Sequence, residues 1–443
     1  MDINYDLAVK NGRVFTSRGL MSIDIWIRDG RIGALGGSHH AEERIDAAGM
    51  LVLPGAVDAH VHFRDPGPNY KEDWASGSAA AAAGGVTAVI DQPNTDPRTL
   101  DARSFALKLD IARHRSIVDF CLNGGPGDVP ALAAAGAAAI GEIFSYEHSD
   151  EQMQRILEQA DKEGLLACLH AEDGQIIRDS TALLLNCQEP EAYSRARPAR
   201  AEAVAIEKAL AVEGRRGRLH ICHLSSALGL QKVLEARQEG RAVTSEVAPH
   251  HLLFTAKDYH EKGSFLKMNP PLRSQADCDA LWQELRGGPS GGNVGIDILA
   301  SDHAPHLPEE KREEIWQAPP GVPGVETMLP IMLMAVKRNM LSLERLVDAS
   351  ASRPAEIFGL AGKGRIEPGR DADLVIVDSK AVSRIDAERL HSRAEWTPYQ
   401  GMQAIFPRMT ILRGTVVFDG EIQGRPGFGR FIRPAEKAEQ KVL

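Results

Sequence analysis

The sequence predicts an α/β protein: a (β/α)8 barrel with a small composite β-sandwich domain formed by both chain ends. In the middle of the chain, helical segments alternate with short β-type runs, as in ASGSAAAAAGG followed by VTAVID. This alternation is typical of a parallel sheet with helical crossovers. Both ends instead carry short alternating runs with tight turns. We therefore expect a β domain at residues 1–52 plus 362–430, a catalytic barrel at 53–361 and a C-terminal tail at 431–443.

The individual elements follow from local patterns. Near the N-terminus, DLAVKNGRVFT and IDIWIRDGRIGALG predict strands joined by an Asn-Gly and an Asp-Gly hairpin turn. A similar pattern returns late, in GRIEPGRDADLVIVD and MTILRGTVVFDGEIQG, so the two ends are expected to pair. Alanine-rich helices are expected near residues 79–83, closed by Gly84 and Gly85, and near residues 131–139.

Composition limits the classes of function. The 443 residues are 43% hydrophobic and 25% charged, and no uninterrupted apolar stretch is long enough to span a bilayer. The segment MDINYDLAVKNGR lacks the features of a secretory signal, so a cytoplasmic protein is expected. The net charge of −10 argues against nucleic-acid binding. Five scattered cysteines without a CxxC pair argue against disulfides and a structural zinc knot.

Histidines and one aspartate end several of the predicted strands. His60 and His62 in GAVDAHVHFRDPG lie two residues apart and so face the same side of a strand. His170, His223 and Asp302 end three further apolar runs. Such ends converge on one face of a barrel, and five imidazole and carboxylate ligands suit two zinc or similar ions. A lone histidine at a strand end is more often a core or loop residue, but the recurrence favours ligands.

Other histidines lack this context. His220, His250 and His251 are expected to be structural or to support the ligands from behind. The polar segment APHLPEEKREEIWQAPPGVPG after Asp302 is either a lid over the barrel mouth or a solvated surface, and the second reading is preferred for all of it except His306.

The chain resembles the amidohydrolase superfamily and, within it, dihydroorotases of the type found in bacteria, archaea and multifunctional pyrimidine-synthesis proteins. The matching segments include DAHVHFRDPG, CHLSS, EVAPHHLLFT and SDHAPH. FRDPG, PNT and NPPLR point more narrowly to dihydroorotase. The resemblance implies one or two zinc ions, with two expected, and the ligands His60, His62, His170, His223 and Asp302.

The resemblance also assigns the substrate contacts: Arg64 and Asn94 to the substrate carboxylate, and Asn269 and His306 to the dihydropyrimidine ring. A guanidinium matches a carboxylate with two parallel hydrogen bonds, which lysine cannot copy. The alternative for Arg64 is an ion pair with nearby Asp65 or Glu72.

One position departs from the family pattern. In many relatives a carboxylated lysine bridges the two metals, whereas others use an aspartate or a single metal. No lysine occurs here from Leu109 to Asp161, and GAAAIGEIFSYEHSD presents Glu142 instead. We expect Glu142 to bridge, because an unpaired carboxylate ending an apolar run would otherwise be buried. The alternative is an ordinary acid paired with a cation beside a mononuclear site.

The expected activity is the reversible cyclisation of N-carbamoyl-L-aspartate to L-dihydroorotate in de novo pyrimidine biosynthesis, by metal-activated hydroxide with Asp302 as general acid and base. A cyclic amidase acting on allantoin or a hydantoin is one alternative, although such substrates lack the carboxylate. A catalytically weak scaffold for aspartate transcarbamoylase is another, although such chains tend to lose metal ligands. The resemblance further implies a homodimer and a partnership with aspartate transcarbamoylase.

Overall fold

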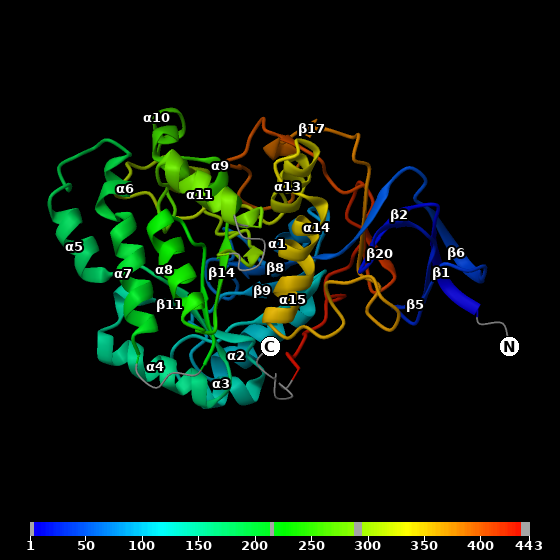
Figure 1. Cartoon of the computed structure of the whole chain (residues 1–443), viewed down its shortest axis with the longest axis horizontal. Helices are drawn as coiled ribbons and strands as arrows, with labels where there is room; N and C mark the ends of the chain where they lie inside the picture. Colours follow the sequence, from blue (N-terminus) through cyan, green and yellow to red (C-terminus); the bar gives the residue numbers. More distant parts are fainter. Residues whose placement is uncertain (1–3, 213–216, 288–294, 436–443) are drawn as a thin grey trace.

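The computed structural model describes residues 4–212, 217–287 and 295–435, and it confirms the predicted barrel (Figure 1). Strands β8 to β14 pair in parallel in two ladders, and β15 completes the second ladder. Parallel bridges join Gly124 to Ile140 and Val61 to His303, so both gaps between the ladders are closed. The barrel strands are β8 (Ala56–Val61), β9 (Val86–Asp91), β10 (Asp119–Leu122), β11 (Ala139–Phe144), β12 (Leu166–His170), β13 (Leu219–Ile221), β14 (Val243–Val247) and β15 (Ile298–Leu299).

Helices surround the strands and cover their outer faces (Figure 1). They are α1 (Trp74–Ala83), α2 (Ala102–Arg115), α3 (Val129–Ala135), α4 (Asp150–Lys162), α5 (Gly174–Ala182), α6 (Ala192–Ala196), α7 (Ala199–Leu210), α8 (Ala227–Gln238), α9 (Pro249–Leu253), α10 (Tyr259–Lys262), α11 (Gln275–Leu285), α12 (Pro308–Lys311), α13 (Met328–Lys337), α14 (Leu343–Val347) and α15 (Arg353–Ile357).

The two alanine-rich segments differ in outcome. Helix α1 begins after Asp73, whose carboxylate caps the first turn, and ends at Gly84 as predicted. A Cβ at Gly84 would lie 2.7 Å from Glu326 Cα, so only glycine fits this close approach. The second prediction was wrong beyond Ala135, because Gly136 adopts a left-handed conformation (φ 99°) and ends α3. The remaining alanines lead into the buried strand β11.

The chain ends form two sheets, as predicted for a composite β domain. The first has the order β5-β4-β1-β6, and the second β20-β19-β16-β7-β2-β3, in which β16 pairs antiparallel with β7. Buried side chains of both sheets, including Val9, Val52 and Leu374, share one core. The strands are β1 (Asn4–Lys10), β2 (Arg13–Thr16), β3 (Gly19–Ser22), β4 (Ile25–Arg28), β5 (Arg31–Leu35), β6 (His40–Asp46), β7 (Leu51–Pro54), β16 (Leu374–Val377), β19 (Met409–Leu412) and β20 (Thr415–Phe418).

Only one of the two predicted hairpins is correct. The Asp-Gly turn joins β4 and β5 as an antiparallel pair. The Asn-Gly turn does not make a hairpin, because β1 pairs with β4 and β6 while β2 pairs with β3 and β7 in the other sheet. Turn chemistry predicts a reversal of the chain, but strand pairing depends on residues distant in sequence.

The segment between β16 and β19 reaches back to the barrel. It contains the short strands β17 (Ser383–Arg384) and β18 (Gln403–Ala404), and the Ile405 N–H donates to the Pro330 carbonyl of α13 (3.0 Å). At the start of the predicted tail, Phe431 bridges to Phe120 of β10. Residues 436–443 of that tail lie outside the described residues.

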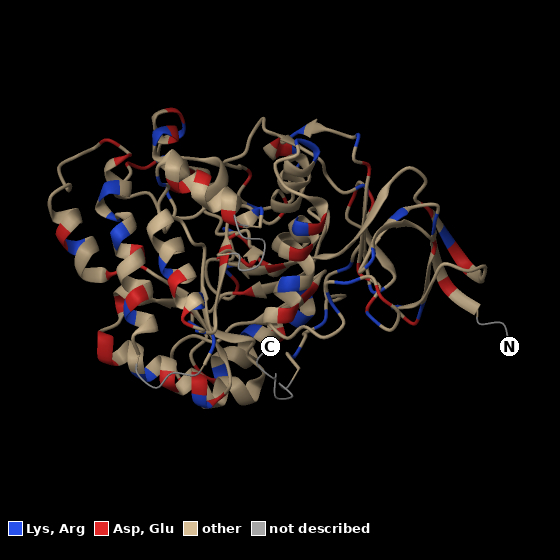
Figure 2. Ribbon diagram, in the orientation of Figure 1, with Lys and Arg blue, Asp and Glu red and all other residues tan. Residues whose placement is uncertain are grey.

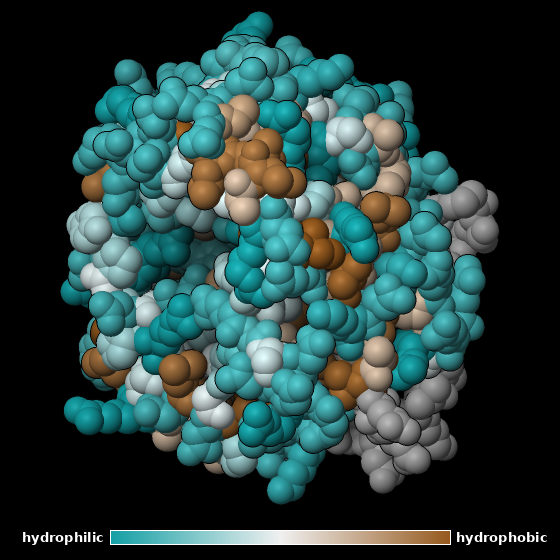
Figure 3. Space-filling view, turned by 90° about the vertical axis from the view of Figure 1, so that its left-hand side faces the viewer, coloured by the Kyte–Doolittle hydropathy of each residue, from teal (hydrophilic) through white to brown (hydrophobic). Residues whose placement is uncertain are grey.

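The surface is of mixed charge. Lys and Arg alternate with Asp and Glu along the helices around the barrel (Figure 2). The face on the left-hand side of Figure 1, away from the two sheets formed by the chain ends, is largely hydrophilic, with hydrophobic residues in separate patches (Figure 3). None of the helices that the structure describes has the length and apolar character needed to cross a lipid bilayer.

Candidate metal centre

The predicted ligand residues meet at one end of the barrel. His60 lies on β8 and His170 ends β12, whereas His62, His223 and Asp302 follow β8, β13 and β15 within three residues. All five are at most 6% exposed. Because the strands are parallel, their carboxyl ends converge, and residues separated by up to 242 positions become neighbours.

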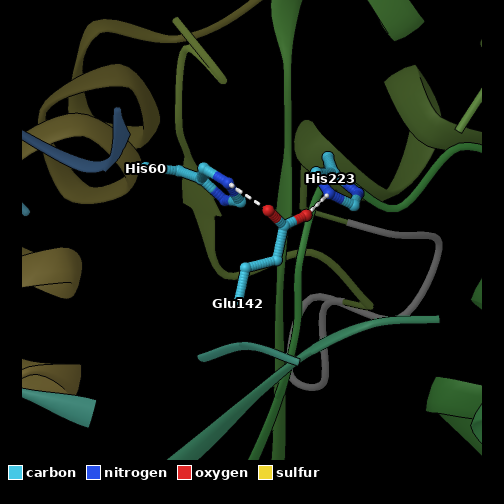
Figure 4. A group of neighbouring side chains, drawn as sticks. All are labelled: His60, Glu142 and His223. Atoms are coloured by element: carbon cyan, nitrogen blue, oxygen red, sulfur yellow. Dashed lines mark hydrogen bonds and ion pairs between the residues drawn. The ribbon is translucent and has the colours of Figure 1, made fainter. Parts of the chain in front are cut away.

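Glu142 of β11 lies between the histidines (Figure 4). Its Oε1 atom is 2.9 Å from His170 Nδ1 and 2.8 Å from His223 Nε2. Its Oε2 atom faces the other side, 3.8 Å from His60 Nε2 and 3.9 Å from His62 Nε2. The two oxygens of one carboxylate therefore address two separate pairs of imidazoles.

Asp302 completes one of these two groups. Its Oδ1 atom is 3.2 Å from His62 Nε2 and 3.7 Å from His60 Nε2. The buried His60 Nε2 has no hydrogen-bond partner among the described residues, yet it faces the carboxylates of Asp302 and Glu142. A nitrogen lone pair pointed at carboxylate oxygens fits a cation held between them, and imidazole with carboxylate is a donor set for divalent metals.

Electrostatics keep both carboxylates in the form that binds metal. Burial alone would raise the pKa of Glu142, but hydrogen bonds to His170 and His223 hold it well below its usual value. Burial likewise opposes the charge on Asp302, and the neighbouring His62 and His60 hold its pKa below the usual range. Both side chains are thus anionic at neutral pH.

Three of the four histidines predicted as ligands make a hydrogen bond to a side-chain oxygen through the ring nitrogen that points away from Glu142 and Asp302. His60 Nδ1 lies 2.6 Å from Glu246, and His62 Nδ1 lies 2.8 Å from the side-chain oxygen of Asn94. His170 Nε2 donates to Glu172 (2.8 Å). Such contacts fix the tautomer and leave the inner nitrogen free for a metal.

Sequence reasoning missed Glu172 and Glu246, although a signal was present. Glu172 stands two residues after His170 in HAED, and Glu246 is the one acid in the buried run VTSEV of β14. His220, predicted to be structural, contacts Thr244 (2.9 Å) and Glu246 (3.1 Å). His250, fully buried, has no hydrogen-bond partner on either ring nitrogen within the described part of the chain.

Of the residues predicted to bind substrate, Arg64 and His306 contact each other, whereas Asn94 and Asn269 contact other side chains. An Arg64 guanidinium nitrogen is 3.2 Å from His306 Nε2. Arg64 makes no ion pair within the described ranges. The two acids considered as its partners pair elsewhere, Asp65 with Arg115 (3.5 Å) and Glu72 with His303 (3.2 Å). The alternative ion pairs of Arg64 are therefore absent there.

Asn94 and Asn269 are held by other side chains. Asn94 contacts His62, so it supports a candidate ligand. The Tyr193 hydroxyl donates to Asn269 Oδ1 (2.6 Å), which leaves the amide nitrogen of Asn269 as its remaining polar group.

The segment after Asp302 is anchored. Lys311 of α12 is fully buried and donates to the carbonyls of Lys267 (2.8 Å), Pro319 (3.0 Å) and Gly321 (3.0 Å). Trp316 donates to the Cys187 carbonyl (2.8 Å). The interpretation of this charge run as solvated surface was wrong for Lys311, since a buried ammonium that caps three carbonyls holds the loop in place.

An eight-stranded parallel barrel with imidazoles and carboxylates at its strand ends defines a metal-dependent hydrolase. A model of the amidohydrolase family matches residues 51–417, and the chain belongs to this family. Family and donor set together imply a divalent metal ion.

Individual relatives narrow the comparison. A dihydroorotase from Methanosarcina acetivorans is 42% identical over 98% of this chain and 97% of its own length. An allantoinase from Rubrobacter xylanophilus is 38% identical over 98% of this chain and 99% of its own length. Among solved structures, an L-hydantoinase (dihydropyrimidinase) from Arthrobacter aurescens superposes with a TM-score of 0.91 at 34% identity, over 97% of this chain and 100% of that one.

Proposed function

We propose that this chain is a dihydroorotase, which interconverts N-carbamoyl-L-aspartate and L-dihydroorotate in de novo pyrimidine biosynthesis. The observation that carries the proposal is Arg64, a partly buried guanidinium without an ion pair among the described residues. It lies close enough to Asp302 and Glu142, in the candidate metal cluster, to interact with their charges. Dihydroorotate is a cyclic amide with a carboxylate, so it needs both features. The full-length dihydroorotase relatives support the same assignment.

We propose two zinc ions in the centre. One position is offered by His60, His62, Asp302 and Glu142 Oε2, and the other by His170, His223 and Glu142 Oε1. The division of the Glu142 oxygens supports its role as the bridging carboxylate in place of a modified lysine. Zinc held by these residues would supply hydroxide near neutral pH and would polarise the amide carbonyl.

The chain's own residues divide the remaining work. Asp302 accepts the proton of the attacking water and passes it to the departing ring nitrogen, the role of a general acid and base. Arg64, with Asn94, holds the substrate carboxylate, while Asn269 and His306 contact the ring. In the biosynthetic direction Asp302 instead takes the proton from the carbamoyl nitrogen as the ring closes.

The test is a comparison of substrates. Purified protein supplemented with zinc is assayed for ring opening of L-dihydroorotate, allantoin and hydantoin under the same conditions. A rate for dihydroorotate in the ordinary enzymatic range, at least 100-fold above the other two, is expected. The allantoinase relative makes an allantoinase or hydantoinase the second candidate, and preferential turnover of either compound would establish it instead.

Replacing Arg64 with methionine is expected to lower kcat/KM for dihydroorotate by about 10- to 100-fold, because a charge-assisted pair with the substrate carboxylate is lost. Arg64→Lys keeps the charge but loses the two-pronged geometry, so an intermediate rate is expected. Residual turnover of hydantoin, which lacks the carboxylate, should not change. A parallel loss for both substrates would contradict carboxylate recognition by Arg64.

Tyr193→Phe is expected to raise KM for dihydroorotate about 3- to 10-fold with little change in kcat. The variant removes one hydrogen bond, the one that orients Asn269. Steady-state kinetics measure both constants. A fall in kcat at unchanged KM would mean that Asn269 acts in the chemical step and not in binding.

Further properties are proposed on the family resemblance. We propose a homodimer and a partnership with aspartate transcarbamoylase, which gel filtration with and without that enzyme tests. We propose a cytoplasmic location, which the five free cysteines support, since oxidising compartments favour disulfides. The domain boundaries 1–52 plus 362–430 and 53–361 remain predictions.

A further inference from the structure

A buried carboxylate lies directly behind one of the proposed ligands. Glu172 is fully buried and accepts a hydrogen bond from His170 Nε2 (2.8 Å). The Ser145 hydroxyl accepts from the Glu172 N–H (2.8 Å) and lies 2.9 Å from the His170 carbonyl, so side chain and backbone are both held. With its proton on Nε2, a neutral His170 can offer the Nδ1 lone pair to a metal ion beside Glu142 Oε1, which lies 2.9 Å from Nδ1.

Arg197 holds Glu172 from the opposite side. Its Nε atom lies 3.1 Å from each Glu172 oxygen, and its terminal NH2 group makes a further, shorter contact. The guanidinium also lies over the Tyr146 ring (5.0 Å), which packs edge-on against His170 (5.3 Å). A buried carboxylate needs such a partner, because an unpaired charge in the interior is strongly unfavourable.

This support is unequal between the two proposed metal positions. His170 and His223 bring Nδ1 and Nε2 to within 3.1 Å of each other, beside Glu142 Oε1. His223 Nδ1 has no hydrogen-bond partner within the described residues, so among them Glu172 is the one carboxylate bonded to an outer ring nitrogen of this pair. At the other position Glu246 lies behind the His60 ring and Asn94 behind the His62 ring, and Glu246 also accepts from the backbone N–H of His223 (3.1 Å).

We propose that Glu172, anchored by Arg197, is a positioning residue that sets the metal affinity of the His170–His223 position and leaves the His60–His62 position unaffected. The inference rests on the metal centre of the proposed function and deepens it. Carboxylates that orient a ligating imidazole contribute about 10- to 100-fold to metal affinity. Neither residue touches the substrate in this scheme.

The test is a zinc titration against a chromophoric chelator, which resolves two dissociation constants for the full chain. Glu172→Gln is expected to raise one of the two dissociation constants by about 10- to 100-fold and to leave the other unchanged. Cobalt substituted for zinc reports through its visible spectrum which position has changed. Arg197→Lys keeps a cation but loses contact with both oxygens, so a smaller change in the same constant is expected.

Glu326→Gln is the matched control. Glu326 is a buried carboxylate that accepts from His391 Nδ1 (2.9 Å), a pair of the same kind whose histidine is no proposed ligand. Both zinc constants should stay at the wild-type values. The inference is overturned if Glu172→Gln leaves both constants within twofold, or if it weakens both equally together with a fall in Tm.

The measurement is independent of turnover. Wild-type protein that binds two zinc ions but does not open dihydroorotate would defeat the proposed substrate, while the effect of Glu172→Gln on one constant would still decide the inference. Wild-type protein with a single zinc constant would overturn the inference, and the dihydroorotase assay would still stand.

Discussion

Glu142→Ala is expected to reduce bound zinc from two ions to one per chain and to lower kcat/KM for dihydroorotate by about 1,000-fold. In the part of the chain that the structure describes, Glu142 is the one carboxylate whose two oxygens face the inner ring nitrogens of both pairs of histidines. Its removal leaves four imidazoles with the single carboxylate of Asp302, too little negative charge for two divalent ions. Loss of one ion also removes a large share of the electrostatic stabilisation of the transition state.

Metal content by atomic emission and initial rates measure this effect. Glu147→Ala is the matched control, since Glu147 lies five residues on and its side chain, 35% exposed, pairs with Arg98 at the surface (3.0 Å). That variant should keep two ions and the full rate. If the Glu142→Ala protein keeps full metal content and full rate, Glu142 does not bind metal and is an ordinary buried acid.

Asp302→Asn is expected to lower kcat by about 100- to 10,000-fold while the protein stays folded, because the amide cannot accept the proton of the attacking water. The amide oxygen still occupies the place of Oδ1 beside His62, so loss of zinc should be smaller than in Glu142→Ala. Rates with zinc in excess separate the loss of proton transfer from a weaker metal site.

Asp297→Asn provides the comparison for Asp302→Asn. Asp297 immediately precedes β15, at the opposite end of the same strand, and pairs with Arg237 and with Arg353 (3.2 Å). Breaking these part-buried pairs should lower Tm and leave kcat nearly unchanged. Equal losses of kcat in the two variants would show that Asp302 acts through structure and not through proton transfer.

Much of the fold could be predicted because its signals are local. The β9 strand appears in the sequence as VTAVID with its observed bounds, and the end of α1 is marked by Gly84. The prediction failed where local signals compete. Ala139 continues an alanine-rich run, yet it begins a strand, because Gly136 ends the helix and the barrel interior requires a small buried residue.

In the candidate site, too, some relations between residues could be predicted from local sequence and others could not. His60 and His62 could be paired from the sequence, since residues two apart in a strand share a face. The outer partners of the histidines could not be assigned, because Glu246 is 186 positions from His60. Lys311 shows the opposite error: a lysine within a charged run is normally solvated, and only the folded loop buries it against three carbonyls.

The sequence by itself determined the barrel, the pairing of the two chain ends and the types of residue available to bind metal and substrate. These features could be predicted because hydrophobic periodicity, turn residues and ligand residues are recognisable within short segments. The tertiary structure alone decided that the two oxygens of Glu142 face different pairs of histidines, and that Glu172 and Arg197 stand behind His170. These relations depend on distances between strands far apart in the chain, which are set by closure of the barrel.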